Sequence, residues 1–212
     1  MIALWTALLL QATPVPPYAA LPTATVADLT AENIDAKRYE KLAAGEILTE
    51  RRPTPKDKTG VHVAAFGIIR GKADEVFTAV EDCPTMPQYM PHFVYCGTVA
   101  PDKPLPPNER YNENKLEFGF FPFKMNIDVI QHAVLDPPHK ISWGRVRGDT
   151  KLSEGYWRVI SLAPDLQLLA YDTLTDPGSA VPAFIQRALT ENDLPKTVEA
   201  VRKWVEGGHA GR

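Results

Sequence analysis

The sequence predicts an α+β domain in which an antiparallel sheet packs against a long C-terminal helix. Between Val61 and Thr175, runs of β-branched and aromatic residues alternate with short turn sequences, which is typical of successive strands. Strands joined by short turns pair antiparallel, and the resulting sheet has an apolar face to bury. The last long segment supplies the cover, because its apolar residues recur at helical spacing at Leu194, Val198, Val201 and Val205.

The size and composition indicate a single globular domain. The chain has 212 residues, a formal net charge of −3 and 44% apolar residues, enough to bury a core and a cavity. The charge is nearly balanced and shows no basic stripe, so no nucleic-acid partner is expected. The 20 prolines cluster between the predicted elements, where they stiffen connections.

The first 20 residues are interpreted as a signal peptide or a flexible N-terminus. Ile2 to Leu10 is an apolar run of signal-peptide length that is too short to span a bilayer. Cleavage would fall after Ala12 or after Ala20, although neither site is ideal and no basic residue precedes the run. With export the protein is periplasmic or secreted; without it the protein is cytoplasmic.

Residues 21–60 are expected to form an N-terminal helix and a linker. Asp28 to Glu50 reads as one helix, with Thr30 available as its cap and Glu32 in the first turn. Arg51 to Thr59 is polar and contains two prolines, so it is the linker. This extra helix is expected to pack on the outside of the domain.

The central elements follow in order. Val61 to Arg70 is a β-branched strand, Lys72 to Asp82 a short helix, and Cys83 to His92 an apolar loop with three prolines. An apolar loop of this kind often covers a cavity mouth. Six further strands are predicted at Phe93–Ala100, Glu109–Phe120, Phe123–Ala133, Lys140–Arg147, Gly155–Ala163 and Gln167–Thr175.

The closing helix is predicted from Ala180 to Glu206. Pro182 suits its first turn, and Pro195 predicts a kink or a restart with Asn192 or Asp193 as a cap. Gly207-Gly208 ends the helix and leaves 207–212 as a tail.

Cysteine and histidine usage points to no metal site. Cys83 and Cys96 are the only cysteines, and in an exported protein they could form a disulfide; the alternative is two buried thiols. None of the five histidines has HxxxH spacing or joins a cysteine cluster, so neither a metal nor another cofactor is expected. His92, beside the apolar loop, is the histidine with the best case for acid/base work.

Three stretches carry a resemblance to a known superfamily. They are Gly71 to Phe77 with Asp82-Cys83-Pro84 and Tyr89-Met90-Pro91; Gly155 to Val159 with Leu169-Ala170-Tyr171; and Asp176-Pro177-Gly178 through Val181-Pro182 and Leu194-Pro195 to Val201-Arg202. Together with the strands between them, residues 61–206 resemble the START-like, or SRPBCC, polyketide cyclase/dehydrase and lipid-transport proteins. The resemblance implies a helix-grip fold, in which a curved antiparallel sheet wraps around the C-terminal helix and encloses an apolar cavity.

The aromatic and methionine residues of the strands and the apolar loop are the candidates for ligand contact. Such side chains suit apolar ligands of varied shape, but they equally suit core packing. The candidates are Met86, Tyr89, Phe118, Phe123, Met125, Trp143, Trp157, Tyr171 and Phe184.

The leading hypothesis is therefore binding or transport of a hydrophobic, lipid-like small molecule by a monomer with transient membrane contact. No catalytic residue is assigned, because the sequence has no nucleophile elbow, phosphate-binding loop or dinucleotide fingerprint. The alternative is a cyclase, dehydratase or hydrolase using the same cavity, with His92, Tyr156, Tyr171 and Asp172 as its polar candidates. A third reading is an interaction module with a filled core.

Overall fold

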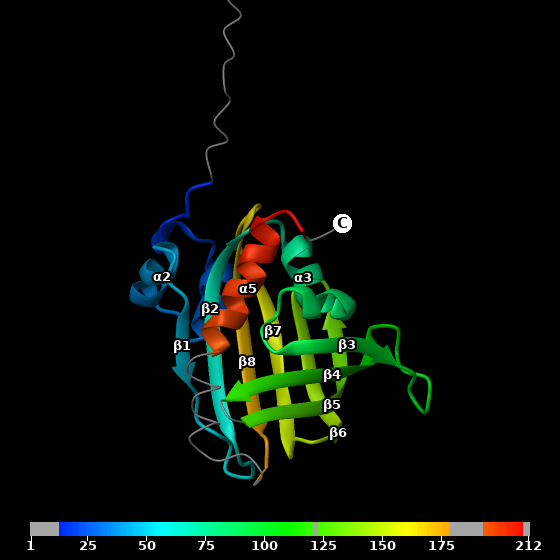
Figure 1. Cartoon of the computed structure of the whole chain (residues 1–212). Helices are drawn as coiled ribbons and strands as arrows, with labels where there is room; N and C mark the ends of the chain where they lie inside the picture. Colours follow the sequence, from blue (N-terminus) through cyan, green and yellow to red (C-terminus); the bar gives the residue numbers. More distant parts are fainter. Residues whose placement is uncertain (1–12, 121–122, 179–192, 210–212) are drawn as a thin grey trace, which may run out of the picture.

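The computed structural model describes residues 13–120, 123–178 and 193–209, and these form one sheet with helices on both faces. The described strands form an eight-stranded sheet in the order β1-β2-β8-β7-β6-β5-β4-β3, and every neighbouring pair is antiparallel. Figure 1 shows the sheet curving around the C-terminal helix. The strands are β1 Leu48–Arg51, β2 Val61–Arg70, β3 Phe93–Val99, β4 Glu109–Phe120, β5 Phe123–Asp136, β6 Lys140–Gly148, β7 Leu152–Ala163 and β8 Leu166–Asp176.

The predicted α+β class and helix-grip arrangement are confirmed. All seven predicted strands are present, with β2 and β4 at the predicted bounds and β7 beginning three residues early, at Leu152. The short helix is α3, Ala73–Glu81, as expected. The loop after it is more regular than predicted, because Cys83–Gln88 forms the 3-10 helix η2.

The C-terminal helix α5, Leu194–Glu206, lies on the inner face of the sheet across β2 (Figure 1). Its four predicted apolar positions, Leu194 to Val205, are all buried. Close approach is possible because β2 has a glycine there: a Cβ on Gly67 would lie 2.7 Å from Cγ1 of Val198. Pro195 stands in the first turn of α5, so the helix begins there; the predicted segment 180–192 lies outside the described residues.

The prediction of one helix over Asp28–Glu50 is wrong. Two helices, α1 Thr23–Ala31 and α2 Ala36–Ala43, occupy this part of the chain, and β1 follows them. The chain turns between the helices at Asn33, whose φ is +62°. Asp35 then caps α2 by accepting a hydrogen bond from the Arg38 amide at 2.8 Å, whereas the Thr30 hydroxyl bonds back to the Val26 carbonyl within α1.

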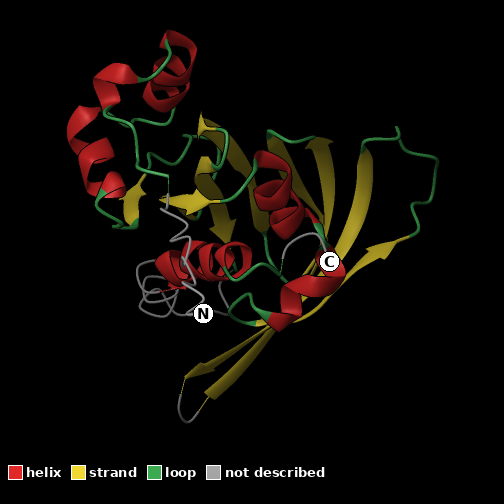
Figure 2. Ribbon diagram, turned by 90° about the horizontal axis from the view of Figure 1, so that it is seen from above, coloured by secondary structure: helices red, strands yellow, loops and turns green. Residues whose placement is uncertain are grey.

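Two separate cores hold the layers together. The inner core lies between the sheet, α3 and α5, and the outer core lies between the sheet and the N-terminal helices. Successive side chains of a strand point to opposite faces, so the same strand contributes to both cores. In β2, Ala65 and Ile69 belong to the inner core and Phe66 to the outer core. Viewed from above in Figure 2, the N-terminal helices and α5 lie on opposite sides of the strands. This outer layer leaves the inner face free to form a cavity.

A disulfide joins η2 to the edge strand β3. Cys83 and Cys96 are bonded, with their Cα atoms 5.1 Å apart, and both residues are buried. The bridge ties the segment after α3 to the sheet.

Removing this bridge is expected to lower the free energy of unfolding by roughly 3 kcal/mol, because it closes a loop of about 14 residues in the unfolded chain. The double substitution Cys83→Ala with Cys96→Ala tests this by urea denaturation. Reductant should lower the stability of the wild-type protein and leave the variant unchanged. Equal stability of the oxidised wild-type protein and the variant would contradict the prediction.

Candidate ligand-binding cavity

A cavity of about 260 Å³ lies between the inner face of the sheet, the η2 segment and the beginning of α5. Most of its wall is apolar, because most of the strand side chains that alternate onto the inner face are aliphatic or aromatic. The apolar lining includes Val61, Val63, Val80, Met86, Met90, Phe93, Leu116, Phe118, Ile127, Val129, Ile141, Trp143, Trp157 and Leu194.

Three stacked aromatic rings form one side of the cavity. The rings of Trp157 and Tyr171, which are directly opposite on β7 and β8, lie 4.0 Å apart at 18°. Trp143 on β6 stacks on Tyr171 at 5.8 Å, and it lies over β7 at Gly155, its cross-strand neighbour. Burial raises the pKa of Tyr171 to about 12, so its phenol stays protonated at neutral pH. This side of the cavity is therefore flat, apolar and uncharged.

A band of polar side chains crosses the wall. Asn114 on β4 donates to Oε1 of Gln131 at 2.6 Å, and Gln131 on β5 donates to Oγ of Ser153 at 2.8 Å. Asn114 and Ser153 are buried. Buried polar groups without a partner cost free energy, and this ladder partners its members across three strands.

A pair between His92 and Asp193 forms part of the cavity wall. Nε2 of His92 lies 3.0 Å from Oδ2 of Asp193, and Nδ1 lies 3.1 Å from the carbonyl oxygen of Glu117. Both ring nitrogens therefore face an acceptor oxygen. The His92 ring also lies 4.5 Å from that of Phe118. These contacts connect the loop before β3 to β4 and to the start of α5.

Comparison with known proteins identifies the family. The model of the polyketide cyclase / dehydrase and lipid transport family matches residues 69–202. The chain belongs to this family. The matched region holds most of the inner core and the cavity, whereas the helices α1 and α2 precede it. Among curated proteins, no sequence matches this chain significantly.

Solved structures show the same fold at low identity. A STAR-related lipid transfer protein fragment from Xanthomonas axonopodis is 16% identical with a TM-score of 0.61, over 76% of this chain and 93% of that one. Human StAR-related lipid transfer protein 5 is 13% identical with a TM-score of 0.60, over 88% and 95%. The Zhui aromatase/cyclase from Streptomyces is 14% identical with a TM-score of 0.53, over 70% and 92%. Lipid-transfer and cyclase proteins thus share this fold.

In this member of the polyketide cyclase and lipid transport family, five of the nine candidate contact residues line the cavity: Met86, Phe118, Trp143, Trp157 and Tyr171. Tyr89 does not; it stacks on Trp204 of α5 at 4.6 Å, beside a second, outer hollow. Met125 is half-buried opposite Phe118 but is not part of the lining. Phe184 and the side chain of Phe123 lie outside the described part of the chain.

The polar candidates for acid/base work are divided between the two faces. His92 and Tyr171 line the cavity. Tyr156 and Asp172 lie on the outer face, where Tyr156 donates to Glu32 at 2.8 Å and Asp172 contacts Arg52 at 2.9 Å. In the described residues, no group of three or more His, Cys, Asp or Glu side chains could hold a metal ion. None of the described helices has the length and the hydropathy that are needed to cross a membrane.

The polar band was missed by the reasoning from sequence. Asn112 and Asn114 were not among the candidates, and polar residues on a half-buried strand usually face solvent. The signal that could have found them is phase: Leu116 and Phe118 continue the same alternate positions of β4, so all four residues share one face.

Proposed function

We propose that this protein binds and carries an apolar, lipid-like small molecule in the cavity between the sheet and α5. The observation that supports it is the cavity itself, whose wall is mostly aliphatic, aromatic and methionine side chains. Its volume of about 260 Å³ is close to the lower end of ligand pockets, which span about 300–1,000 Å³. One ring system or one chain therefore suits it better than a lipid with two chains.

The apolar wall supplies enough free energy for useful affinity. A ligand that buries about 400 Å² of apolar surface gains on the order of 10 kcal/mol. Ordering and association costs offset part of this gain, so micromolar binding needs no charged contact. The alternative function is an enzyme, because the family includes cyclases. An enzyme would need a reactive group in the cavity, and His92 and Tyr171 are the candidates for that group. A filled interaction module is disfavoured by the cavity.

The proposed setting is outside the cytoplasm, in a monomer that meets a membrane only transiently. The disulfide between Cys83 and Cys96 supports export, because such bonds persist in oxidising compartments. The apolar run Ile2–Leu10, which lies outside the described residues, fits the same interpretation.

Native mass spectrometry of the purified protein tests the proposal. A stoichiometric adduct of a few hundred daltons, released by organic solvent, is the expected result. Titration with N-phenyl-1-naphthylamine, a neutral apolar dye, covers the case in which the ligand is lost during purification. An apo mass together with no saturable dye binding would overturn the carrier function.

Trp143→Ala is expected to weaken binding of the dye at least about tenfold, because it removes an aromatic wall of the cavity while the more deeply buried Trp157 stays in place. Arg51→Ala, at an exposed position outside the cavity, is the control and should change affinity less than about twofold. Circular dichroism confirms that both variants are folded. Equal dissociation constants for the two variants would remove Trp143 from the binding wall.

A further inference from the structure

The polar side chains of the cavity wall define which ligand end it accepts. The ladder of Asn114, Gln131 and Ser153 is uncharged, and its hydrogen bonds join β4, β5 and β7. Because these groups bond to one another, the ladder is stable without a ligand. The polar atoms beside it differ in this respect.

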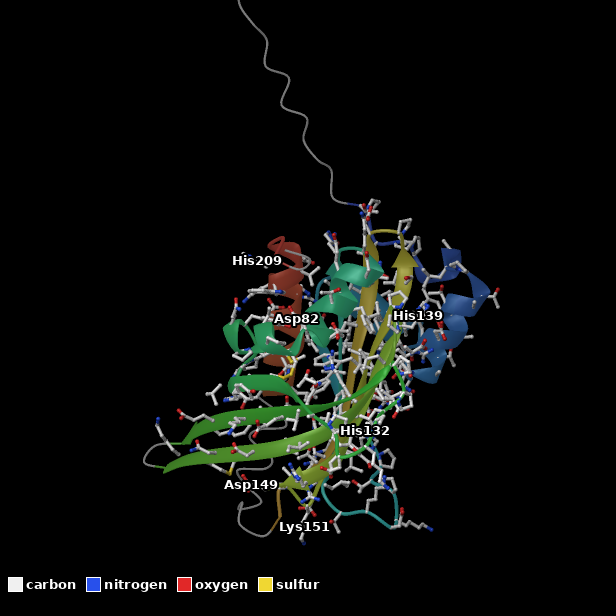
Figure 3. The ribbon with its side chains drawn as sticks, turned by 90° about the vertical axis from the view of Figure 1, so that its right-hand side faces the viewer. Asp82, His132, His139, Asp149, Lys151 and His209 are labelled. Carbon is white, nitrogen blue, oxygen red and sulfur yellow. A yellow bond between two sulfur atoms is a disulfide. The ribbon has the colours of Figure 1, made fainter. Side chains whose placement is uncertain are left out.

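Two polar atoms on uncharged side chains of the wall have no hydrogen-bond partner among the described residues. They are Oδ1 of Asn112 and Oγ1 of Thr150, and both side chains line the cavity. Asn112 is directly opposite Gln131 in the sheet, and Thr150 precedes Ser153 by three residues, so each is a neighbour, in the sheet or along the chain, of a member of the ladder. Thr150 lies in the turn between β6 and β7. The residues before and after it, Asp149 and Lys151, are labelled at the lower end of the sheet in Figure 3.

These two atoms specify a complementary group. Thr150 is only 4% exposed, and an unsatisfied buried polar group costs about 1–3 kcal/mol. The amide oxygen of Asn112 only accepts, whereas the hydroxyl of Thr150 both donates and accepts. A ligand hydroxyl group matches this pair, because it can donate to the amide oxygen and accept from another donor. Nε of Arg110, which also lacks a partner among the described residues, is a second donor in the same wall.

The charges of the described wall are already paired. The Arg110 guanidinium pairs with the Glu81 carboxylate, and His92 pairs with Asp193 at 3.0 Å. A ligand carboxylate or phosphate would therefore enter a largely apolar cavity without a free cation to receive it. Burying such a charge without a partner is strongly unfavourable.

We propose that the cavity selects apolar alcohols or phenols over the corresponding acids, with the ligand hydroxyl group at Asn112 and Thr150. This proposal rests on the carrier function argued above and adds the chemical class of the ligand. It also assigns the polar band a role in selectivity, while the aromatic wall supplies most of the affinity.

A matched set of probes tests it: 2-naphthol, naphthalene and 2-naphthoate share one ring system and compete with N-phenyl-1-naphthylamine for the cavity at pH 7. In the wild-type protein, 2-naphthol should bind at least about tenfold tighter than either of the others. Thr150→Val and Asn112→Leu should each weaken 2-naphthol about tenfold and change naphthalene less than threefold, since only the hydroxyl loses its partner. Asn126→Leu, on the exposed side of β5, is the control.

The outcomes separate the two proposals. If naphthalene and 2-naphthol bind equally, or if 2-naphthoate binds as tightly as 2-naphthol, the hydroxyl selectivity is wrong and the carrier function stands. The same holds if the variants weaken naphthalene and 2-naphthol by the same factor. If neither the dye nor any probe binds to the wild-type protein, the carrier function fails and the selectivity with it. Thr150→Val preserves side-chain shape, so it remains informative if Asn112→Leu does not fold.

Discussion

Gly155→Ala is expected to lower the free energy of unfolding by at least about 3 kcal/mol, the upper part of the range for overpacking. A Cβ at this position would lie 2.1 Å from the carbonyl oxygen of Asp172 and 3.0 Å from Cα of Thr173. Both are backbone atoms of the adjacent strand β8, which cannot move aside without breaking the β7–β8 ladder. The same Cβ would lie 2.8 Å from the Trp143 ring, so the aromatic side of the cavity would be displaced as well.

Gly144→Ala is the matched control, because it lies on the neighbouring strand β6 and has no atom within 4 Å of its added Cβ. There the substitution is expected to be neutral or to stabilise by up to about 1 kcal/mol, since alanine restricts the unfolded chain. Urea denaturation of the two variants and the wild-type protein makes the comparison. Equal stability of the two variants would show that β8 accommodates a side chain at residue 155.

The central fold could be predicted from sequence because its periodicities are long and its turns are marked. Alternation and β-branched composition placed β2 and β4 at their observed bounds, and the spacing of Val198, Val201 and Val205 placed α5. The N-terminal part could not be predicted in the same way. Asn33 interrupts it with a left-handed backbone that the surrounding sequence pattern does not indicate. Among the described strands, β1 is a short strand at the edge of the sheet, next to β2.

The site was less predictable than the fold for a related reason. Aromatic residues suit both a core and a cavity, so their identity alone could not separate Trp143, which lines the cavity, from Tyr89, which stacks on the outer surface of α5. Charged residues on strands were ambiguous as well, because a charged side chain can face solvent or be buried beneath another layer. Asp172, a polar candidate for the cavity, lies on the outer face instead, and it is only 5% exposed because α1 and α2 cover this face of the sheet. Burial there depends on a packing partner more than 100 residues away in sequence.

That covered face carries the second large effect: Glu32→Ala is expected to lower the free energy of unfolding by about 3–5 kcal/mol. The Glu32 carboxylate, 3% exposed, accepts from Arg52 at 3.0 Å and Arg158 at 3.2 Å. Its Oε2 also accepts from the Tyr156 hydroxyl at 2.8 Å. Without it, two guanidinium groups lose their shared anion between the N-terminal helices and the sheet.

Glu117→Ala is the control for this prediction. The ion pair of Glu117 with Lys124 is 3.0 Å long but exposed, with 42% and 73% of the two side chains accessible, so its loss should cost less than about 1 kcal/mol. Urea denaturation measures both changes, and limited proteolysis between α1 and α2, near Asn33, reports whether the outer layer has separated. Because Glu32 contacts the outer face of β7 and the cavity lies on the inner face, dye binding by the remaining folded protein should persist. A large stability loss with no added cleavage near Asn33 would mean that Glu32 stabilises the sheet itself, whereas a loss below about 1 kcal/mol would show that the buried cluster contributes no more than a surface ion pair.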